Sequence, residues 1–165
     1  MQKKVNGTRV VKTYKWEFDT DARSVFLLLC PTKELDWIEG WDEIHQLVYS
    51  ESGIAEDACV FTTKHPDEGF AVWLTSKYSL ENTTIEFVKH LVDKEVIIRW
   101  TMEVRPLTSQ SSVVFTIFNA TGLNERGNEY IKSDILSQFN SRMASLEDLI
   151  KYYLETGAMK KNIKI

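Results

Sequence analysis

Histidine is the side chain that catalysis and metal binding use most often, and this sequence contains three. His45, His65 and His90 lie far apart, and no HxxxH, HExxH or CxxC spacing occurs in the chain. The sequence therefore predicts no metal site. His65 precedes Pro66 in an expected turn, where a solvated side chain is typical. His45 and His90 lie on expected strands and could face either a cavity or the solvent.

Motifs for covalent catalysis and for nucleotide binding are missing as well. A nucleophilic serine or cysteine needs a strained turn or an activating neighbour, and neither GxSxG nor a catalytic-cysteine signature is present. Cys59 lies in the middle of an expected strand, which favours burial. The seven glycines are scattered singly, without a GxGxxG, GxxxxGKS or GxxxxGKT loop for phosphate. We therefore identify no catalytic residue and expect no cofactor.

Aromatic side chains are abundant: five Trp, six Tyr and eight Phe make up 12% of the chain. Such residues fill a core or form the walls of an apolar ligand pocket, and the sequence leaves both interpretations open. Trp37 and Trp41 could also form a lid or rim, and Arg142 could meet a carboxylate or extend to solvent. The candidate lining of a cavity comprises Trp37, Trp41, Trp73, Tyr78, Phe87, His90, Trp100, Met102, Ile135, Phe139, Arg142 and Met143.

Length and charge exclude several classes of function. The chain has 165 residues, so we expect residues 1–165 to form a single domain with its own core. Its 20 basic and 24 acidic residues include no basic run, which argues against nucleic acid as a partner. The longest apolar run, from Val25 to Cys30, is far shorter than the roughly 20 residues that cross a bilayer. We expect no membrane insertion.

The two cysteines bear on the location of the protein. Cys30 and Cys59 lie in apolar surroundings, and the opening MQKKVNGTRV lacks the apolar centre of a signal peptide. We expect reduced thiols in a cytoplasmic protein.

The expected partner is a small apolar molecule, and the expected assembly is a monomer or a homodimer.

The longest regular pattern in the sequence predicts one amphipathic helix from Asn124 to Thr156. Its apolar residues recur at steps of three and four, the period of one helix face, and the residues between them are mostly polar. Gly157 stands where a left-handed C-terminal cap is expected. The apolar stripe consists of Ile131, Ile135, Phe139, Met143, Leu146, Ile150 and Tyr153.

The rest of the chain reads mostly as strands. Alternation from Thr8 to Phe18 predicts the first strand. Asp21 and its neighbours can cap a helix from Ala22 to Leu29, which Pro31 ends, and a second helical piece is expected from Thr32 to Trp41. Turn residues then separate six expected strands: Glu43 to Ser50, Asp57 to Lys64, Phe70 to Ser79, Thr83 to Val92, Glu95 to Arg105 and Ser112 to Ala120.

These elements predict an α+β fold. Short connections between the six strands imply an antiparallel meander, and the first strand can pair only by joining one of its edges. The result is a seven-stranded curved antiparallel sheet, with two short helices after the first strand and one long C-terminal helix across its concave face. A twisted sheet of this size curls, and a single helix leaves a cavity beneath it. Which face of the last strand points inward is left open.

Several segments resemble those of a known superfamily. They are Phe18 to Ala22, Leu35 to Trp41, Phe70 to Trp73, Thr121 to Leu123 and Gly127-Asn128. In this order they resemble the START-like superfamily, also called SRPBCC or helix-grip proteins, which includes birch-pollen-allergen-like and polyketide cyclase/dehydrase-like members. The resemblance implies an internal pocket for an apolar or amphipathic small molecule, such as a lipid, a polyketide or an aromatic compound. It does not imply a reaction.

Three classes of function remain open at this point. The first is binding of an apolar small molecule without catalysis. The second is an enzyme of the cyclase, aromatase or hydratase kind, marked by two or more titratable side chains within reach of one ligand atom. The third is a protein-interaction module such as a chaperone activator, marked by a filled core and an exposed apolar patch.

Overall fold

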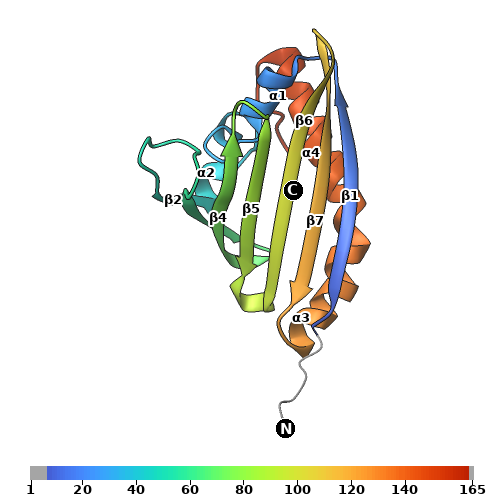
Figure 1. Ribbon diagram of the computed structural model, residues 1–165. Helices are drawn as coiled ribbons and strands as arrows, with labels where there is room; N and C mark the ends of the chain where they lie inside the picture. Colours follow the sequence, from blue (N-terminus) through green and yellow to red (C-terminus); the bar gives the residue numbers. More distant parts are fainter. Residues whose placement is uncertain (1–6, 164–165) are drawn as a thin grey trace.

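The computed structural model describes residues 7–163, so both ends of the expected domain, residues 1–6 and 164–165, lie outside the described part. Seven antiparallel strands form one sheet in the order β1-β7-β6-β5-β4-β3-β2, and a long C-terminal helix packs on its concave face (Figure 1). This confirms the predicted helix-grip fold. The strands are β1 (Arg9–Phe18), β2 (His45–Tyr49), β3 (Val60–His65), β4 (Gly69–Ser79), β5 (Thr84–Leu91), β6 (Val96–Thr108) and β7 (Ser111–Gly122).

Side-chain caps set the ends of the helices. The Asp21 side chain accepts a hydrogen bond from the Ser24 backbone N–H at 3.0 Å, at the start of α1 (Ala22–Leu28). Asn124 caps α3 (Glu125–Tyr130) in the same way. Gly157 adopts the left-handed conformation, with φ of 66°, after α4 (Leu136–Thr156), as predicted.

The long helix is continuous but not uniformly α-helical. Between α3 and α4 lies a π-helical segment, η3 (Ile131–Ile135). Ile131, Ile135, Phe139 and Met143 follow one another at steps of four, and in an α-helix each such step turns the side chain by about 40°. A wider π turn absorbs an extra residue. It keeps the four side chains on the buried face, where each is at most 5% exposed.

The expected second helical piece, Thr32 to Trp41, is split. A single 3-10 turn, η1 (Glu34–Asp36), is followed by Gly40 in the left-handed conformation and then by α2 (Trp41–Ile44). The left-handed residue interrupts the helix between Trp37 and Trp41, so their rings do not share a helix face. Trp37 instead packs in the core, and its indole N–H donates to the Leu28 carbonyl at 3.0 Å.

Strand boundaries differ from prediction at three places. Residues 43 and 44 belong to α2, so β2 begins only at His45. The left-handed Ala58, with φ of 64°, delays the start of β3 to Val60. The β6–β7 hairpin continues through Pro106, where a turn was expected, because the irregular pairing between Pro106 and Thr108 tolerates a residue without an N–H. The 3-10 turn η2 (Val92–Lys94) joins β5 to β6.

The structure settles the orientation of the last strand. Val114 pairs with Trp16 of β1 and Val104 of β6, all of which face the helix. Alternation then turns Phe115 and Ile117 to the convex side, where they are 38% and 44% exposed. The inward set of β7 therefore comprises Val114, Thr116, Phe118 and Ala120.

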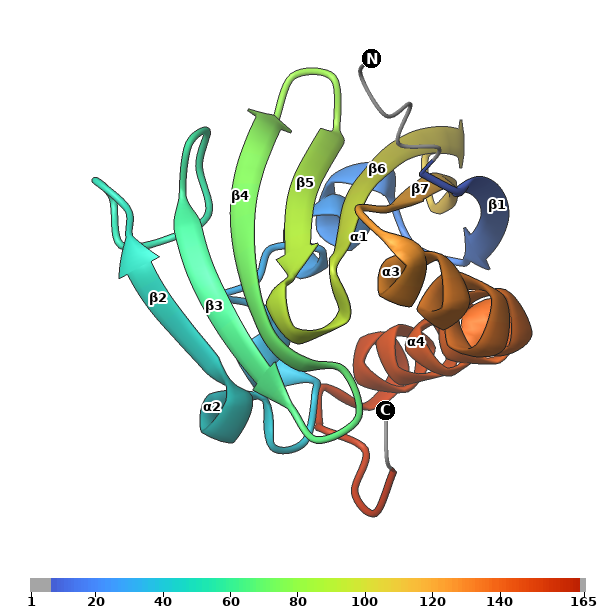
Figure 2. The ribbon, with the colours of Figure 1, turned by 90° about the horizontal axis from the view of Figure 1, so that it is seen from below.

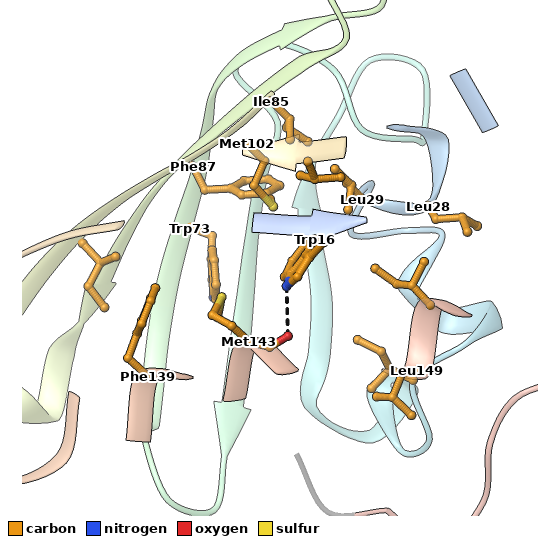
Figure 3. Close-up of a cluster of buried hydrophobic side chains, with 14 of the residues drawn as sticks. Trp16, Leu28, Leu29, Trp73, Ile85, Phe87, Met102, Phe139, Met143 and Leu149 are labelled. Carbon is orange, nitrogen blue, oxygen red and sulfur yellow. Dashed lines mark hydrogen bonds between the residues drawn. The ribbon is translucent and has the colours of Figure 1, made fainter. Parts of the chain in front are cut away.

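A hydrophobic core fills one end of the space between sheet and helix. Figure 2 shows the sheet curving from β2 to β1 with α4 on the inner side of the curve. At the α1 end, Phe26 and Met102 belong to this core. The indole N–H of Trp16 donates to the Met143 carbonyl at 3.0 Å and ties β1 to α4 (Figure 3).

Among residues 7–163, no helix has the length and apolarity needed to cross a bilayer.

Gly127 provides a test of how α3 packs on the sheet. A Cβ added there would lie 2.1 Å from the Glu95 carbonyl oxygen. Gly127→Ala should therefore destabilise the protein by about 1–3 kcal/mol, although alanine favours helices intrinsically. Asn140→Ala, on the exposed face of α4, should change stability by less than about 0.5 kcal/mol. Urea unfolding measures both, and a stabilising Gly127→Ala would contradict the close approach.

Candidate ligand-binding cavity

A cavity of about 550 Å³ lies between the sheet and α4. Strands β3 to β7 provide one wall, through side chains such as Phe61, Trp73 and Trp100. The helix provides the other, through Phe139 and Met143. Its remaining border comprises the segment from residue 31 to 44, the β3–β4 turn and Ile163 near the C-terminus. The C-terminal segment is held in place where the Asn162 backbone N–H donates to the Glu39 carboxylate at 2.6 Å.

The sheet wall is a set of packed aromatic rings. Phe61 stacks on Trp73 with ring centroids 5.2 Å apart, and Phe87 meets both rings edge-on. On the border, Trp41 stacks on His45, which contacts Phe61. The Trp73 indole N–H donates to the Thr63 hydroxyl at 2.9 Å, which fixes the ring. Figure 3 shows Trp73 and Phe87 facing Phe139 and Met143 across the interior. The wall is rigid, apolar and aromatic.

The structure brings most of the predicted lining residues together. Eight of the twelve border the cavity: Trp41, Trp73, Phe87, Trp100, Ile135, Phe139, Arg142 and Met143. That they contact a ligand remains a prediction. The other four, Trp37, Tyr78, His90 and Met102, lie elsewhere, and the prediction that they line the cavity was wrong.

His90 lies on the convex face of the sheet. It pairs with Val72 and Ile97, which both point away from α4, so strand parity places it outside. Its neighbour Lys89 takes the inward position and borders the cavity.

Of the other three residues, Trp37 and Met102 belong to the core and Tyr78 packs against it. Tyr78 follows an irregularity in β4 between Thr75 and Lys77, which shifts the alternation, and its ring lies 5.2 Å from that of Phe26 in α1. Met102 points to the concave side, but it belongs to the core (Figure 3). Trp37 is buried there too, because Gly40 separates it from the border residue Trp41.

A network of charged side chains borders the cavity. Lys89, only 7% exposed, forms an ion pair with Glu68 of the β3–β4 turn. Arg142 of α4 approaches Glu68 and Asp134, each at 3.3 Å. The Lys89 ammonium also lies 4.3 Å from the centre of the Trp73 ring. Both cations are therefore already neutralised, and Arg142 is not free for a ligand carboxylate.

The network determines the ionisation of Glu68. Burial alone would raise the pKa of this carboxyl, but Lys89 and Arg142 outweigh burial and hold the pKa below its ordinary value of 4.5. Glu68 is therefore ionised at neutral pH. The turn that carries it is consequently attached to both β5 and α4.

Glu34 is a titratable group without such a partner. It lies on η1 and borders the cavity, and its carboxylate makes no hydrogen bond or ion pair within residues 7–163. Burial raises the pKa of Glu34 to about 8, and the charge of Lys89 only partly opposes this effect. The Trp100 indole nitrogen is also buried without a hydrogen-bond partner in the described chain. Residues 7–163 contain no group of three or more metal-binding side chains.

Sequence reasoning missed the polar part of the cavity. The inward position of Lys89 could have been predicted, because in β5 it lies on the same face as Ile85, Phe87 and Leu91, and all three are buried. Glu68 and Glu34 gave no such signal. Their positions follow from a turn and a 3-10 segment, whose side-chain directions have no simple period.

No protein-family model and no curated protein matches the sequence. Among solved structures, norcoclaurine synthase from Thalictrum flavum is similar, with a TM-score of 0.70 and 16% identity over 91% of this chain and 88% of that one. A hypothetical protein from Helicobacter pylori has a TM-score of 0.63 and 13% identity, covering 88% and 87%. The di-domain ARO/CYC protein BexL, from the BE-7585A biosynthetic pathway, has a TM-score of 0.62 and 14% identity, and the match covers 88% of this chain and 47% of BexL.

These likenesses show the fold. The chain has the helix-grip fold of START-like proteins, as the sequence resemblance implied. At identities of 13–16%, side chains in the cavity are not transferable between the proteins. The chemistry of this cavity has to be argued from its own residues.

The ion pairs of Glu68 give a prediction with a defined pH dependence. Because the pKa of Glu68 is lowered on folding, its charge contributes stability that is present above about pH 4.5 and is lost as the pH falls through the folded pKa. Glu68→Gln should cost about 3 kcal/mol at pH 7, because it leaves buried Lys89 without its counter-charge. As the pH falls from 7 through the folded pKa, the wild-type carboxyl becomes protonated too, so the difference should shrink.

Chemical denaturation at pH 7 and pH 3 measures this difference. The control is Glu103→Gln, which removes an exposed pair with Arg105 and should cost less than about 1 kcal/mol at either pH. Equal losses for the two variants at pH 7 would show that the Glu68 network is not a buried one.

Proposed function

We propose that this protein binds an apolar or amphipathic small molecule, such as a lipid, a polyketide or an aromatic compound, in the cavity between sheet and helix. The observation that carries the proposal is the aromatic-walled space of about 550 Å³. Ligand sites are typically of about 300–1,000 Å³, mostly apolar, with a few polar groups. The solved structures with this fold include an aromatase/cyclase-type protein, which supports the same class of ligand. We place the protein in the cytoplasm, in agreement with its free, buried Cys30 and Cys59.

The cavity also weighs against the interaction module. Such a module was expected to have a filled interior and an exposed apolar patch. Phe70, Val72 and Leu74 on the convex side are 37–40% exposed, but the interior is open. An open interior favours a small ligand over a protein partner as the main function.

Filling the cavity should abolish binding. A naphthalene-type dye titrated into the wild type should quench tryptophan fluorescence at micromolar concentration, because Trp73 and Trp100 border the cavity. Met143→Trp replaces a methionine by the larger indole side chain in the cavity and should weaken dye binding at least about tenfold. Leu136→Trp is the matched control, since it adds the same ring on the exposed face of the helix.

Calorimetry confirms the affinities independently of the added tryptophan, and circular dichroism confirms that both variants fold. Binding that survives in Met143→Trp would place the ligand elsewhere. A wild type that binds no member of a broad panel of apolar compounds would contradict the proposed function.

A second candidate function is acid–base catalysis on a bound ligand. The observation that favours it is that Glu34 and Lys89, two titratable groups, border the same cavity. A carboxyl with a pKa of about 8 can exchange protons near neutral pH, as a general acid or base must. The mark that separates the cyclase, aromatase or hydratase class from a passive carrier is two such groups within reach of one ligand atom, and a shared cavity is the first condition for it.

Proton exchange on an apolar ketone tests the catalytic candidate. In this step the Glu34 carboxylate takes a proton from the carbon next to the carbonyl of 2-tetralone, and a deuteron from heavy water replaces it. The exchange rate, followed by proton NMR, should exceed the buffer rate and rise with pH through about 8 as Glu34 ionises. Glu34→Gln should return it to the buffer rate, whereas Asp42→Asn on the exposed part of α2 should not. Equal rates in wild type and Glu34→Gln would exclude Glu34 as the base.

A further inference from the structure

Acidic groups outnumber basic ones around the cavity. Three side chains that border it are basic: Lys89, Arg142 and His65. Five are carboxylates: Glu34, Glu39, Glu43, Asp67 and Glu68. The carboxyl groups lie on the 31–44 segment and the β3–β4 turn, and the basic groups lie at the end of β3, on β5 and on α4. Their sum gives the cavity a negative potential, which attracts cations and repels anions.

The existing ion pairs strengthen this bias. Lys89 contacts Glu68 and the face of Trp73, and Arg142 contacts Glu68 and Asp134. An anionic ligand would have to break one of these pairs and leave a carboxylate without its partner. Such a loss in a buried network is expensive. The basic side chains are therefore occupied by the protein itself.

Glu34 is in the opposite situation. Its carboxylate has no ion pair or hydrogen bond within the described chain, and Lys89 acts on it only through space. A carboxylate that faces an apolar cavity without a counter-charge is unstable, which is why burial favours its protonated form. A ligand that brings a positive charge supplies the missing partner and restores the ionised form.

An aromatic ring accompanies this carboxyl. Trp41 comes from the same segment and borders the same cavity. Its indole N–H donates to the Pro31 carbonyl at 2.9 Å, and its ring stacks on His45. Aromatic faces attract alkylammonium groups, and tryptophan does so best. A carboxylate and aromatic rings around one apolar space suit an organic cation.

We propose that the ligand of this cavity is a cationic amphiphile, an ammonium group on an aromatic or aliphatic body, and that Glu34 is the residue that recognises its charge. This inference rests on the proposed binding function and names the class of ligand. It also argues against one of the two alternatives that the sequence left open for Arg142, that this residue meets a carboxylate of the ligand.

Three probes with one aromatic body and different charges test the inference. They are (naphthalen-2-ylmethyl)trimethylammonium, naphthalen-2-ylmethanol and naphthalene-2-acetate, titrated calorimetrically at pH 7 and pH 9. The quaternary ammonium keeps its charge at both values, so a change in its affinity reports on the protein. Glu34→Gln is the test variant. Asp42→Asn removes the same charge from an exposed position that does not border the cavity.

The ammonium probe should bind at least about tenfold more tightly than the alcohol at pH 9, and the acetate most weakly. With a pKa of about 8, the ionised fraction of Glu34 rises about tenfold from pH 7 to pH 9, and ammonium affinity should rise in proportion. The alcohol should show no such dependence. Glu34→Gln should remove both the preference and the pH dependence, and Asp42→Asn should preserve both.

The outcomes separate this inference from the function on which it rests. Alcohol binding with no preference for the ammonium would overturn the cationic ligand and leave the binding function intact. Equal losses in Glu34→Gln and Asp42→Asn would assign the preference to overall charge and overturn the role of Glu34. Failure of all three probes to bind would contradict both proposals.

Discussion

The structure depends on one geometric constraint: a curved seven-stranded sheet offers more concave surface than one helix can cover. The α4 helix is fixed against the sheet by the buried Trp16–Met143 hydrogen bond and by its apolar stripe. At the α1 end, Phe26 and Met102 belong to the core that fills the remaining space. Elsewhere no comparable element of residues 7–163 fills the space, and a cavity results. The same packing that stabilises the fold thus creates the candidate binding site.

The network of Lys89, Glu68 and Arg142 has two effects at the border of the cavity. Charged groups are costly to bury, and a set of apolar residues of similar volume would often be more stable. Here the network attaches the β3–β4 turn, through Glu68, to β5 and to α4. It thereby fixes the border of the cavity. It also places polar atoms beside an aromatic wall, the combination that gives a pocket both affinity and orientation.

The sequence predicted the architecture because its strongest signals are periodic. Helix and strand patterns, together with caps such as Asp21 and Gly157, were sufficient for the element order and the sheet. The successive steps of four from Ile131 to Met143 are also consistent with the π-helical segment that the structure shows. The prediction of side-chain directions failed where an irregularity interrupts the helix or strand pattern. The irregularity before Tyr78 and the left-handed Gly40 are examples, and His90 shows that an error of one residue in parity moves a side chain to the other face.

The electrostatic character of the cavity follows from where the β3–β4 turn lies. Lys89 is the inward cation of the sheet wall and has two carboxylates in its surroundings, Glu68 and Glu34. Because the turn brings Glu68 into direct contact, the lysine charge is used there and Glu34 remains without a partner. Had η1 brought Glu34 to the lysine instead, Glu34 would have a counter-charge. A choice of partner between two loop residues, which no sequence period reveals, therefore decides whether the candidate site keeps Glu34 without a counter-charge.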